Sequence, residues 1–209
     1  GIACVAGACT DVRVALSTGA RMGVESYGAV GSSDWQVWRD TLAPDVFSAT
    51  DFAIGISRGL EGMRIVYPMS RTGLVYGLPA ARRIVAATLE TVGNAGVGFI
   101  DSLGEMVELV EFAPSSPTVI VASDYALSHW RMSSSFGSNP AVNWQGGATV
   151  RMTLNSQGLV YLNTVLGSQA GLGLVTSRDR GGTMPPSAGG STLVPLLRAR
   201  TALIITYEP

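Results

Sequence analysis

The sequence lacks lysine: all fourteen of its basic residues are arginines, and they nearly balance fifteen acidic residues. With one histidine and two cysteines, it also offers few of the side chains that hold transition metals in proteins. A net charge of −1 provides no concentrated positive surface for a phosphate backbone. We therefore expect no nucleic-acid partner, no metal site and no cofactor.

Long apolar runs are also missing. No run approaches the roughly 18 residues of a membrane-spanning helix, and no basic segment followed by an apolar one marks a signal peptide. We therefore expect no membrane insertion. Nevertheless, 46% of the residues are hydrophobic and only 14% are charged. Because so much apolar surface has to be buried, we expect identical subunits to share it, as obligate oligomers do.

The two cysteines, Cys4 and Cys9, lie close together near the start of the sequence. We expect two buried thiols, and a small loop closed by a disulfide is the alternative. Neither arrangement defines the redox compartment of the protein.

Three segments share a pattern of apolar strand, polar turn and second strand. They are 21–30, 63–76 and 151–161, with turns that would end at Gly28, Gly73 and Gly158. A glycine after a short polar run supplies the positive φ that a tight turn needs. Upstream, residues 49–54 match residues 122–127 in residue class at every position. We therefore predict an internal duplication of hairpin units that carry insertions of different lengths.

The segment 79–117 departs from this pattern. Pro79 and the apolar residues that follow at helical spacing predict a short helical segment around 79–106. The Val-rich stretch 107–112 fits either state, and we favour a strand there. We also predict strands at 118–121, 193–197 and 201–207, the last of which should be paired.

The fold class that follows is mainly β. We divide the chain into a β-repeat region with two hairpin units at 1–78, an insertion at 79–117, and a region at 118–209. The last region holds the third unit, a C-terminal β portion and an exposed Gly-rich loop at 176–191.

One short motif around Ser57 is typical of a catalytic serine. Gly55-Ile-Ser-Arg-Gly59 matches the G-x-S-x-G nucleophile elbow, and Asp101 or Asp124 followed by His129 would supply acid and base in the hydrolase order. The elbow requires a helix directly after Ser57, whereas the following residues predict a turn and another strand. A serine hydrolase is therefore the lesser alternative, and we expect no enzyme.

The repeat carries a resemblance to a known family. Arg151-Met152 followed by Asn-Ser-Gln-Gly-Leu-Val-Tyr161, with Asp124-Tyr-Ala-Leu127 upstream, resembles the β-repeat sequences of tailed-bacteriophage tail fibres and related virion fibres. The resemblance covers about a third of the chain. The segment 79–112 has no fibre signature, and the His-x-His metal motif of some fibre tips is absent.

The resemblance implies an intertwined homotrimer in the virion that contacts other virion proteins and attaches to a bacterial surface glycan or protein. A capsid-associated, head-fibre or baseplate protein remains the alternative. By analogy with fibres, attachment would use the loops at 133–140 and 176–187. Candidate receptor contacts are Trp130 and Trp144, whose rings stack on sugars, and Arg178 and Arg180, whose guanidinium groups bind acidic ones.

Overall fold

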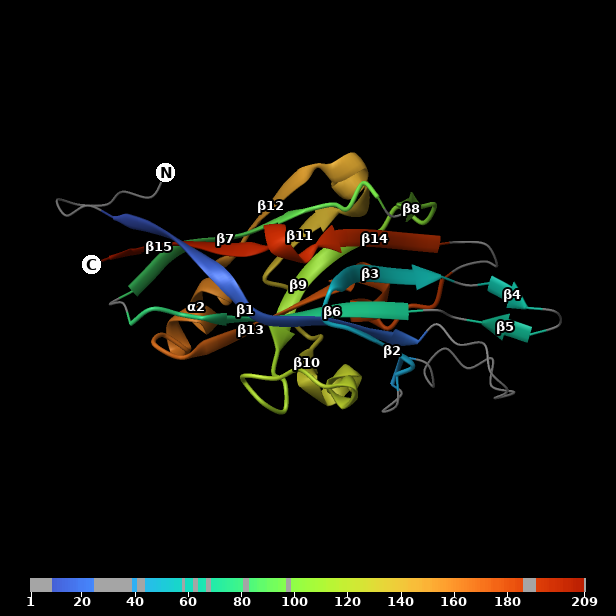
Figure 1. Cartoon of the computed structure of the whole chain (residues 1–209), viewed down its shortest axis with the longest axis horizontal. Coiled ribbons are helices and arrows are strands. Elements are labelled where there is room, and N and C mark those ends of the chain that lie inside the picture. Colours follow the sequence, from blue (N-terminus) through green and yellow to red (C-terminus); the bar gives the residue numbers. More distant parts are fainter. Residues whose placement is uncertain are drawn as a thin grey trace.

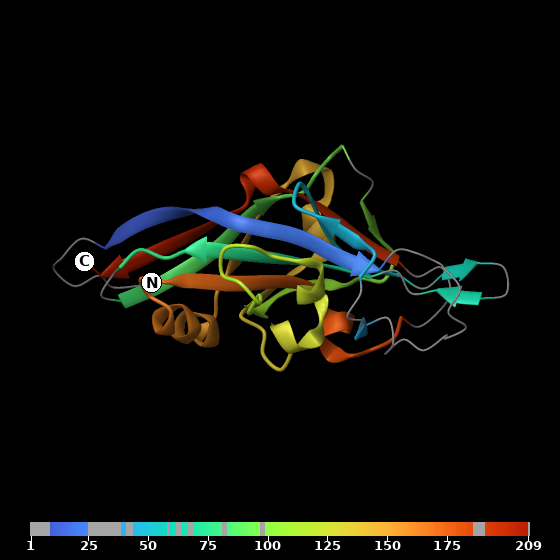
Figure 2. The same cartoon turned by 60° about the horizontal axis from the view of Figure 1, so that its bottom comes forward.

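Long antiparallel strands run mostly along the longest axis of the molecule (Figure 1). The structure is a computed structural model that describes residues 9–24, 39–40, 44–57, 59–61, 64–66, 69–80, 83–96, 99–185 and 191–208. Among these residues, 13 strands form one sheet, and the β4–β5 hairpin lies at the end opposite the start of β1 (Figures 1 and 2). The prediction of a mainly β fold is confirmed.

The described elements are as follows. The strands are β1 (Thr10–Val24), β2 (Val46–Ser48), β3 (Asp51–Ser57), β4 (Gly59–Glu61), β5 (Arg64–Val66), β6 (Met69–Gly77), β7 (Arg83–Val92), β8 (Ile100–Asp101), β9 (Met106–Phe112), β10 (Trp130–Arg131), β11 (Gly137–Pro140), β12 (Thr149–Thr153), β13 (Gln169–Thr176), β14 (Ser191–Leu197) and β15 (Ala202–Glu208). The helices are α2 (Ser156–Thr164) and α3 (Ser177–Gly181), with 3-10 turns η1 (Ala122–Tyr125), η2 (Leu127–His129), η3 (Ala141–Gly147) and η4 (Arg198–Arg200).

The hydrogen-bonded strand order is β10-β9-β13-β6-β1-β15-β7-β12, and each neighbouring pair is antiparallel. β14 lies off this path and pairs with β3, which returns to β6. A bridge between Gly93 and Leu196, with a 2.8 Å bond from Asn94 N–H to Pro195 O, joins the end of β7 to β14. The strands β14, β3, β6, β1, β15 and β7 therefore form a closed ring.

The larger hydrophobic core draws on the strands of this ring and on β9, β12, β13, α2 and η3. Every strand of the ring contributes buried side chains to it, such as Phe52, Leu74, Leu89, Leu196 and Leu203. A smaller cluster around Phe112, Tyr125 and Trp130 lies elsewhere on the sheet. One chain thus buries many of the apolar residues for which we expected a shared interface, and the homotrimer remains a prediction.

Gly73 is not a turn residue, which corrects the prediction from the sequence. It lies within β6, directly opposite Gly173 of β13. A Cβ on Gly73 would lie 2.5 Å from the ring of Phe112, and one on Gly173 would lie 2.5 Å from the ring of Trp130. The two rings pack against each other with centroids 4.5 Å apart. These glycines are therefore required by close packing of aromatic rings on the sheet.

Gly158 is also wrongly predicted as a turn residue, because it lies in the first turn of α2. The Asn155 side chain accepts a 3.0 Å hydrogen bond from the Gly158 N–H and so caps the helix. A Cβ at this position would lie 2.9 Å from Phe136 Cβ, which explains why the helix has a glycine there. The third predicted turn glycine, Gly28, lies outside the described residues.

The predicted duplication is not visible as a shared local structure. Residues 51–57 form β3, whereas 122–125 form the 3-10 turn η1. Residues 151–161 form a strand followed by a helix, rather than a hairpin. A common origin of these segments stays a prediction about the sequence.

Several further predictions can be compared with the described strands. The helical segment around 79–106 is wrong, because β7 and β8 occupy it. The strand at 118–121 is also wrong, because the Asp124 carboxylate accepts the N–H groups of Ser115 and Val121 and holds this segment in a turn. The strands at 107–112, 193–197 and 201–207 are confirmed as β9, β14 and β15, and β15 is paired on both sides.

The three predicted regions of the chain contribute to a single sheet. β1 and β6 of the first region pair with β15 and β13 of the last, and β9 of the middle region pairs with β13.

Cys9 is disulfide-bonded, which corrects the expectation of two buried thiols. Cys4 lies outside the described residues.

Candidate binding groove

The two tryptophans predicted to stack on a sugar are core residues of the folded chain. Trp130 is 4% exposed, and its Nε1–H donates to Asp124 O at 2.8 Å. Trp144, in η3, is 1% exposed and belongs to the larger core. Both side chains are buried in this chain, and their role as receptor contacts stays a prediction. The Trp130 ring packs against Phe112 of β9 and lies over Gly173 of β13.

The two predicted arginine contacts are engaged in ion pairs. Arg178 pairs with Glu105, and Arg180 pairs with Glu108. Glu105 also accepts hydrogen bonds from the Ser177 hydroxyl at 2.6 Å and from the Arg178 N–H at 3.1 Å. The expected exposed loop at 176–191 therefore begins as a short helix, α3. The carboxylates of Glu105, just before β9, and Glu108, within β9, hold this helix in place. Residues 186–190 lie outside the described residues.

The serine motif does not have the structure of a nucleophile elbow. Ser57 is the last residue of β3 and pairs with Ser191 of β14, and the strand β4 begins at Gly59. The helix that the elbow requires after its serine is replaced by a strand. His129 makes a 2.7 Å hydrogen bond from Nδ1 to Ala113 O, and both oxygens of Asp124 accept backbone N–H groups. These side chains stabilise a turn, and among the described residues no hydrogen bond or ion pair joins either of them to Ser57.

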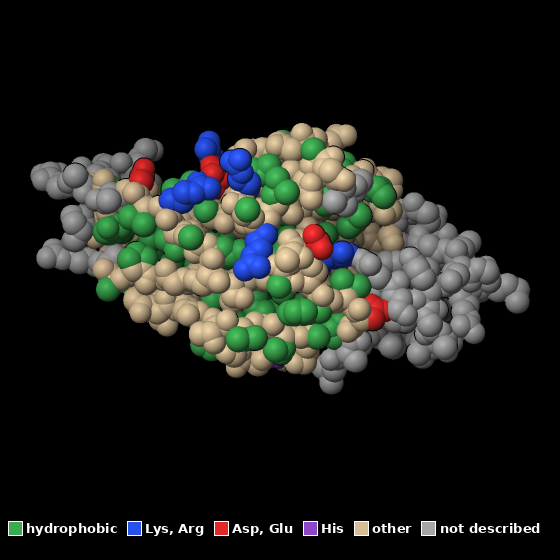
Figure 3. Space-filling model, in the orientation of Figure 1, with side chains coloured by type: hydrophobic (Ala, Val, Ile, Leu, Met, Phe, Trp, Pro, Cys, Tyr) green, Lys and Arg blue, Asp and Glu red, His purple; other side chains and the backbone are tan. Residues whose placement is uncertain are grey.

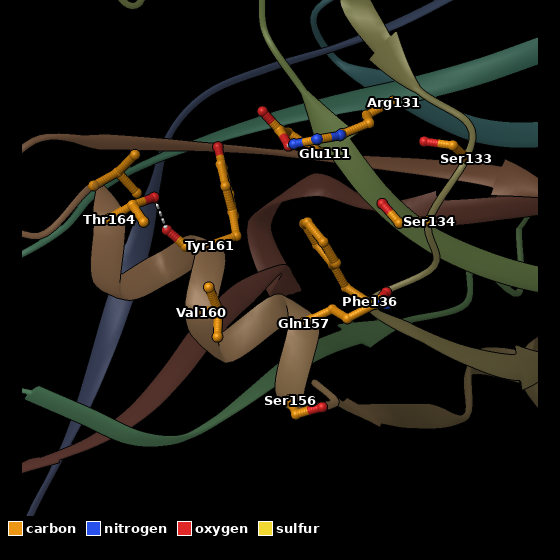
Figure 4. Close-up of a pocket in the computed structure, with 11 residues that line it drawn as sticks. Glu111, Arg131, Ser133, Ser134, Phe136, Ser156, Gln157, Val160, Tyr161 and Thr164 are labelled. Carbon is orange, nitrogen blue, oxygen red and sulfur yellow. Dashed lines mark hydrogen bonds and ion pairs between the residues drawn. The ribbon is translucent and has the colours of Figure 1, made fainter.

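A groove lies between α2 and the β9–β10 edge of the sheet, and Figure 4 shows its lining. Its volume is about 580 Å³, in the usual range for small-ligand sites. The residues at 133–140 that we predicted as a loop supply part of the lining, and Gly137–Pro140 continues as β11 along β9. The lining residues are Glu111, Arg131, Ser133, Ser134, Phe136, Ser156, Gln157, Val160, Tyr161, Thr164 and Val165.

The groove has an aromatic wall held rigidly in place. The rings of Phe136 and Tyr161 stack with centroids 5.2 Å apart and an interplanar angle of 23°. The Tyr161 hydroxyl donates to Gly171 O at 3.1 Å and accepts from Gly171 N–H at 3.0 Å, which fixes α2 against β13. Burial raises the pKa of this phenol. Tyr161 is therefore neutral and offers a ligand its ring rather than its hydroxyl.

The rim of the groove is polar. Arg131 Nη1 lies 3.1 Å from Glu111 Oε2, and the Arg131 side chain is 67% exposed, so most of its donors face solvent. Serine hydroxyls and Gln157 complete the rim. Val160 projects from α2 with 65% of its surface exposed. An aromatic and aliphatic wall beneath hydroxyl, amide and charged groups is suited to a ligand with one apolar face and many hydrogen-bonding groups.

A second groove of about 610 Å³ lies on the other side of the same helix, towards β7. Asn163 builds its floor: its amide accepts the Ile84 N–H and donates to the Ile84 and Leu159 carbonyls, each at 2.8 to 2.9 Å. The two grooves share Ser156, Val160 and Thr164, which form a ridge along α2. Both grooves therefore border one exposed helix face, which neither the hairpin prediction nor the tryptophan prediction identified.

The described residues contain no group of three or more His, Cys, Asp or Glu side chains arranged to hold a metal ion. In this part of the chain, no helix has the length and apolar character needed to cross a membrane. No protein-family model matches the sequence, and no curated protein matches it.

Proposed function

We propose that this chain is a structural virion protein, a tail fibre or receptor-binding module of a bacteriophage, that attaches to the host by binding a surface glycan beside α2. The resemblance of its repeat sequences to virion fibres supports the virion role. The observation that carries the binding role is the groove at Phe136 and Tyr161.

A hexose has an apolar face of C–H groups and an edge of hydroxyls. The partly exposed ring of Tyr161, backed by the buried ring of Phe136, and exposed Val160 provide apolar contact area. Arg131, Glu111 and the rim serines provide donors and acceptors for the hydroxyls. Because the aromatic wall is held by backbone hydrogen bonds to β13, little ordering entropy is lost on binding.

The test is an array of bacterial surface oligosaccharides probed with the protein and with Val160→Arg. Val160 is exposed, so the longer charged side chain should block the groove without disturbing the core. We expect array binding by the unchanged protein and its loss in Val160→Arg. Val142→Arg is the matched control, because Val142 is 54% exposed and does not line the groove.

Absence of binding by the folded, unchanged protein would contradict the attachment role. Such a result would favour the alternative of a capsid-associated, head-fibre or baseplate structural protein. Equal binding by Val160→Arg would place the attachment site elsewhere on the molecule.

We also propose that the chain assembles as a homotrimer with itself and contacts other virion proteins. Exposed apolar side chains remain on one chain, including Phe47, Ile100, Val119 and Val121. On the face shown in Figure 3, charged side chains are few and gather in small groups between apolar and neutral polar areas. Light scattering should give about three times the 21.7 kDa mass of one chain, and a monomer would contradict the trimer.

A further inference from the structure

The second groove differs from the first in its charge. Among the described residues that line it, Arg83 at the start of β7 is the one that carries a charge. Its register partner on β15 is Glu208, yet no ion pair or side-chain hydrogen bond of Arg83 is found within the described part of the chain. Arg83 is exposed, and its guanidinium can donate hydrogen bonds to a ligand.

Taken together, the two grooves carry a positive charge. The first groove holds Arg131 and Glu111, which neutralise each other, so Arg83 leaves an excess of one. The chain as a whole has a net charge of −1. Among the described lining residues, this excess positive charge at Arg83 favours an anionic ligand.

The two grooves are also placed for a chain-like ligand. They meet along the α2 ridge of Ser156, Val160 and Thr164, and they open on either side of it. A ring stacked in the first groove can extend across Val160 so that the next units reach Arg83. A single sugar would occupy one groove and leave the other unused.

We propose that the ligand is an acidic polysaccharide that crosses the α2 ridge, with a sugar ring against Tyr161 and Val160 and a carboxylate on Arg83. This inference rests on the proposed glycan-binding function and adds the class of glycan. Arg83 and the carboxylate form a bidentate, charge-assisted pair, which specifies an acidic unit at that position.

The experiment compares two probes of the same length and linkage: a β-1,4-linked hexasaccharide of mannuronic acid and its carboxyl-reduced, neutral counterpart. Isothermal titration is performed with the unchanged chain, Arg83→Gln and Arg200→Gln. Arg200 is the matched control, because it is exposed, lines neither groove and loses the same charge.

We expect the acidic probe to bind more tightly than the neutral one, and Arg83→Gln to weaken acidic binding by about tenfold, as expected for loss of a charge-assisted pair. Neutral binding should be unchanged in Arg83→Gln, and Arg200→Gln should bind both probes as the unchanged chain does. The preference for the acidic probe should also shrink as salt is raised.

The outcomes separate this inference from the proposed function. Equal affinity for both probes, with loss of both in Val160→Arg, would overturn the acidic specificity and leave glycan binding standing. A preference for the acidic probe that Arg83→Gln does not reduce would also overturn it. Binding of neither probe would overturn the inference and count against the function on which it rests.

Discussion

Arg71 of β6 and Asp179 of α3 form a buried bidentate ion pair across 108 positions of sequence. Arg71 Nε lies 2.6 Å from Asp179 Oδ2, and Nη2 lies 2.9 Å from Oδ1. The remaining donors reach Tyr125 O at 2.7 Å and Arg39 O at 3.0 Å. One guanidinium therefore connects the central strand, α3, η1 and the segment at 39–40.

Breaking this pair should destabilise the fold strongly. Arg71→Met leaves the buried Asp179 carboxylate with only the longer 3.4 Å ion pair to Arg39. Removing one partner of a buried ion pair costs about 3 to 5 kcal/mol of unfolding free energy. The double variant Arg71→Met, Asp179→Leu should recover part of this loss, because it removes both charges. Urea unfolding followed by circular dichroism measures each value.

Arg131→Met serves as the control for this comparison, because its ion pair with Glu111 is exposed. Exposed pairs contribute about 0 to 1 kcal/mol. If Arg71→Met lowers the unfolding free energy no more than Arg131→Met does, the structural role of the buried pair is refuted.

Trp130→Ala should reduce stability rather than specifically reduce ligand binding. Deleting a buried aromatic side chain costs about 3 to 5 kcal/mol, and here it also removes the hydrogen bond to Asp124 O. Trp130→Phe should cost less, because it keeps most of the packing against Phe112. Thermal unfolding measures the loss, and glycan affinity is compared for the folded fraction only. A stable Trp130→Ala protein that no longer binds would restore the ring to the binding site.

The sequence correctly predicts strands that a short continuous stretch of residues specifies. The C-terminal stretches at 193–197 and 201–207 are β-branched or aliphatic and lie between turn residues, and both are strands. The helix α2 could also have been predicted from the sequence, because Asn155 is a preferred N-cap residue and Leu159, Leu162 and Val165 follow at helical spacing. The glycine at 158 led us instead to a hairpin, since its packing against Phe136 is not visible in sequence.

The candidate grooves required tertiary information. Trp130 and Trp144 were assigned as receptor contacts by analogy with the loops of virion fibres, yet both are buried in the folded chain. Arg178 and Arg180 looked free because Glu105 and Glu108, their partners, precede them by more than 70 positions. The residues next to Arg83 and Arg131 in the sequence do not show that these two arginines line a groove while Arg178 and Arg180 form ion pairs. Only the packing of α2 between β7 and β9 brings them to one face.

Gly73→Ala tests the aromatic packing on the sheet. The added methyl would lie 2.5 Å from the Phe112 ring, which is itself fixed by Trp130. Overpacking of this kind costs about 1 to 3 kcal/mol, so we expect a lower melting temperature. Gly77→Ala in the same strand is the control, because the nearest atom to its Cβ is Ser17 Oγ at 3.6 Å. Equal melting temperatures for the two variants would rule out the close contact.

Glu90 should make the stability of the protein dependent on acidity. Its carboxylate lies 2.6 Å from Nη1 of Arg13, on β1, and 2.8 Å from Nε of Arg151, on the adjacent strand β12. These hydrogen bonds hold the pKa of Glu90 below its ordinary value. The unfolded chain therefore binds the proton more readily than the folded one. The stabilisation is complete above the ordinary glutamate pKa of about 4.3, and it is lost as the pH falls through the lower folded value.

Glu90→Gln should remove this contribution. We expect the variant to be less stable than the unchanged protein at neutral pH, and the difference between them to narrow as the pH falls below about 4. Thermal unfolding across the pH range gives both curves. The double variant Arg13→Gln, Arg151→Gln should narrow the same difference, because it removes the groups that lower the Glu90 pKa. Parallel curves for Glu90→Gln and the unchanged protein would show that the carboxylate has the same proton affinity in the folded and unfolded chains.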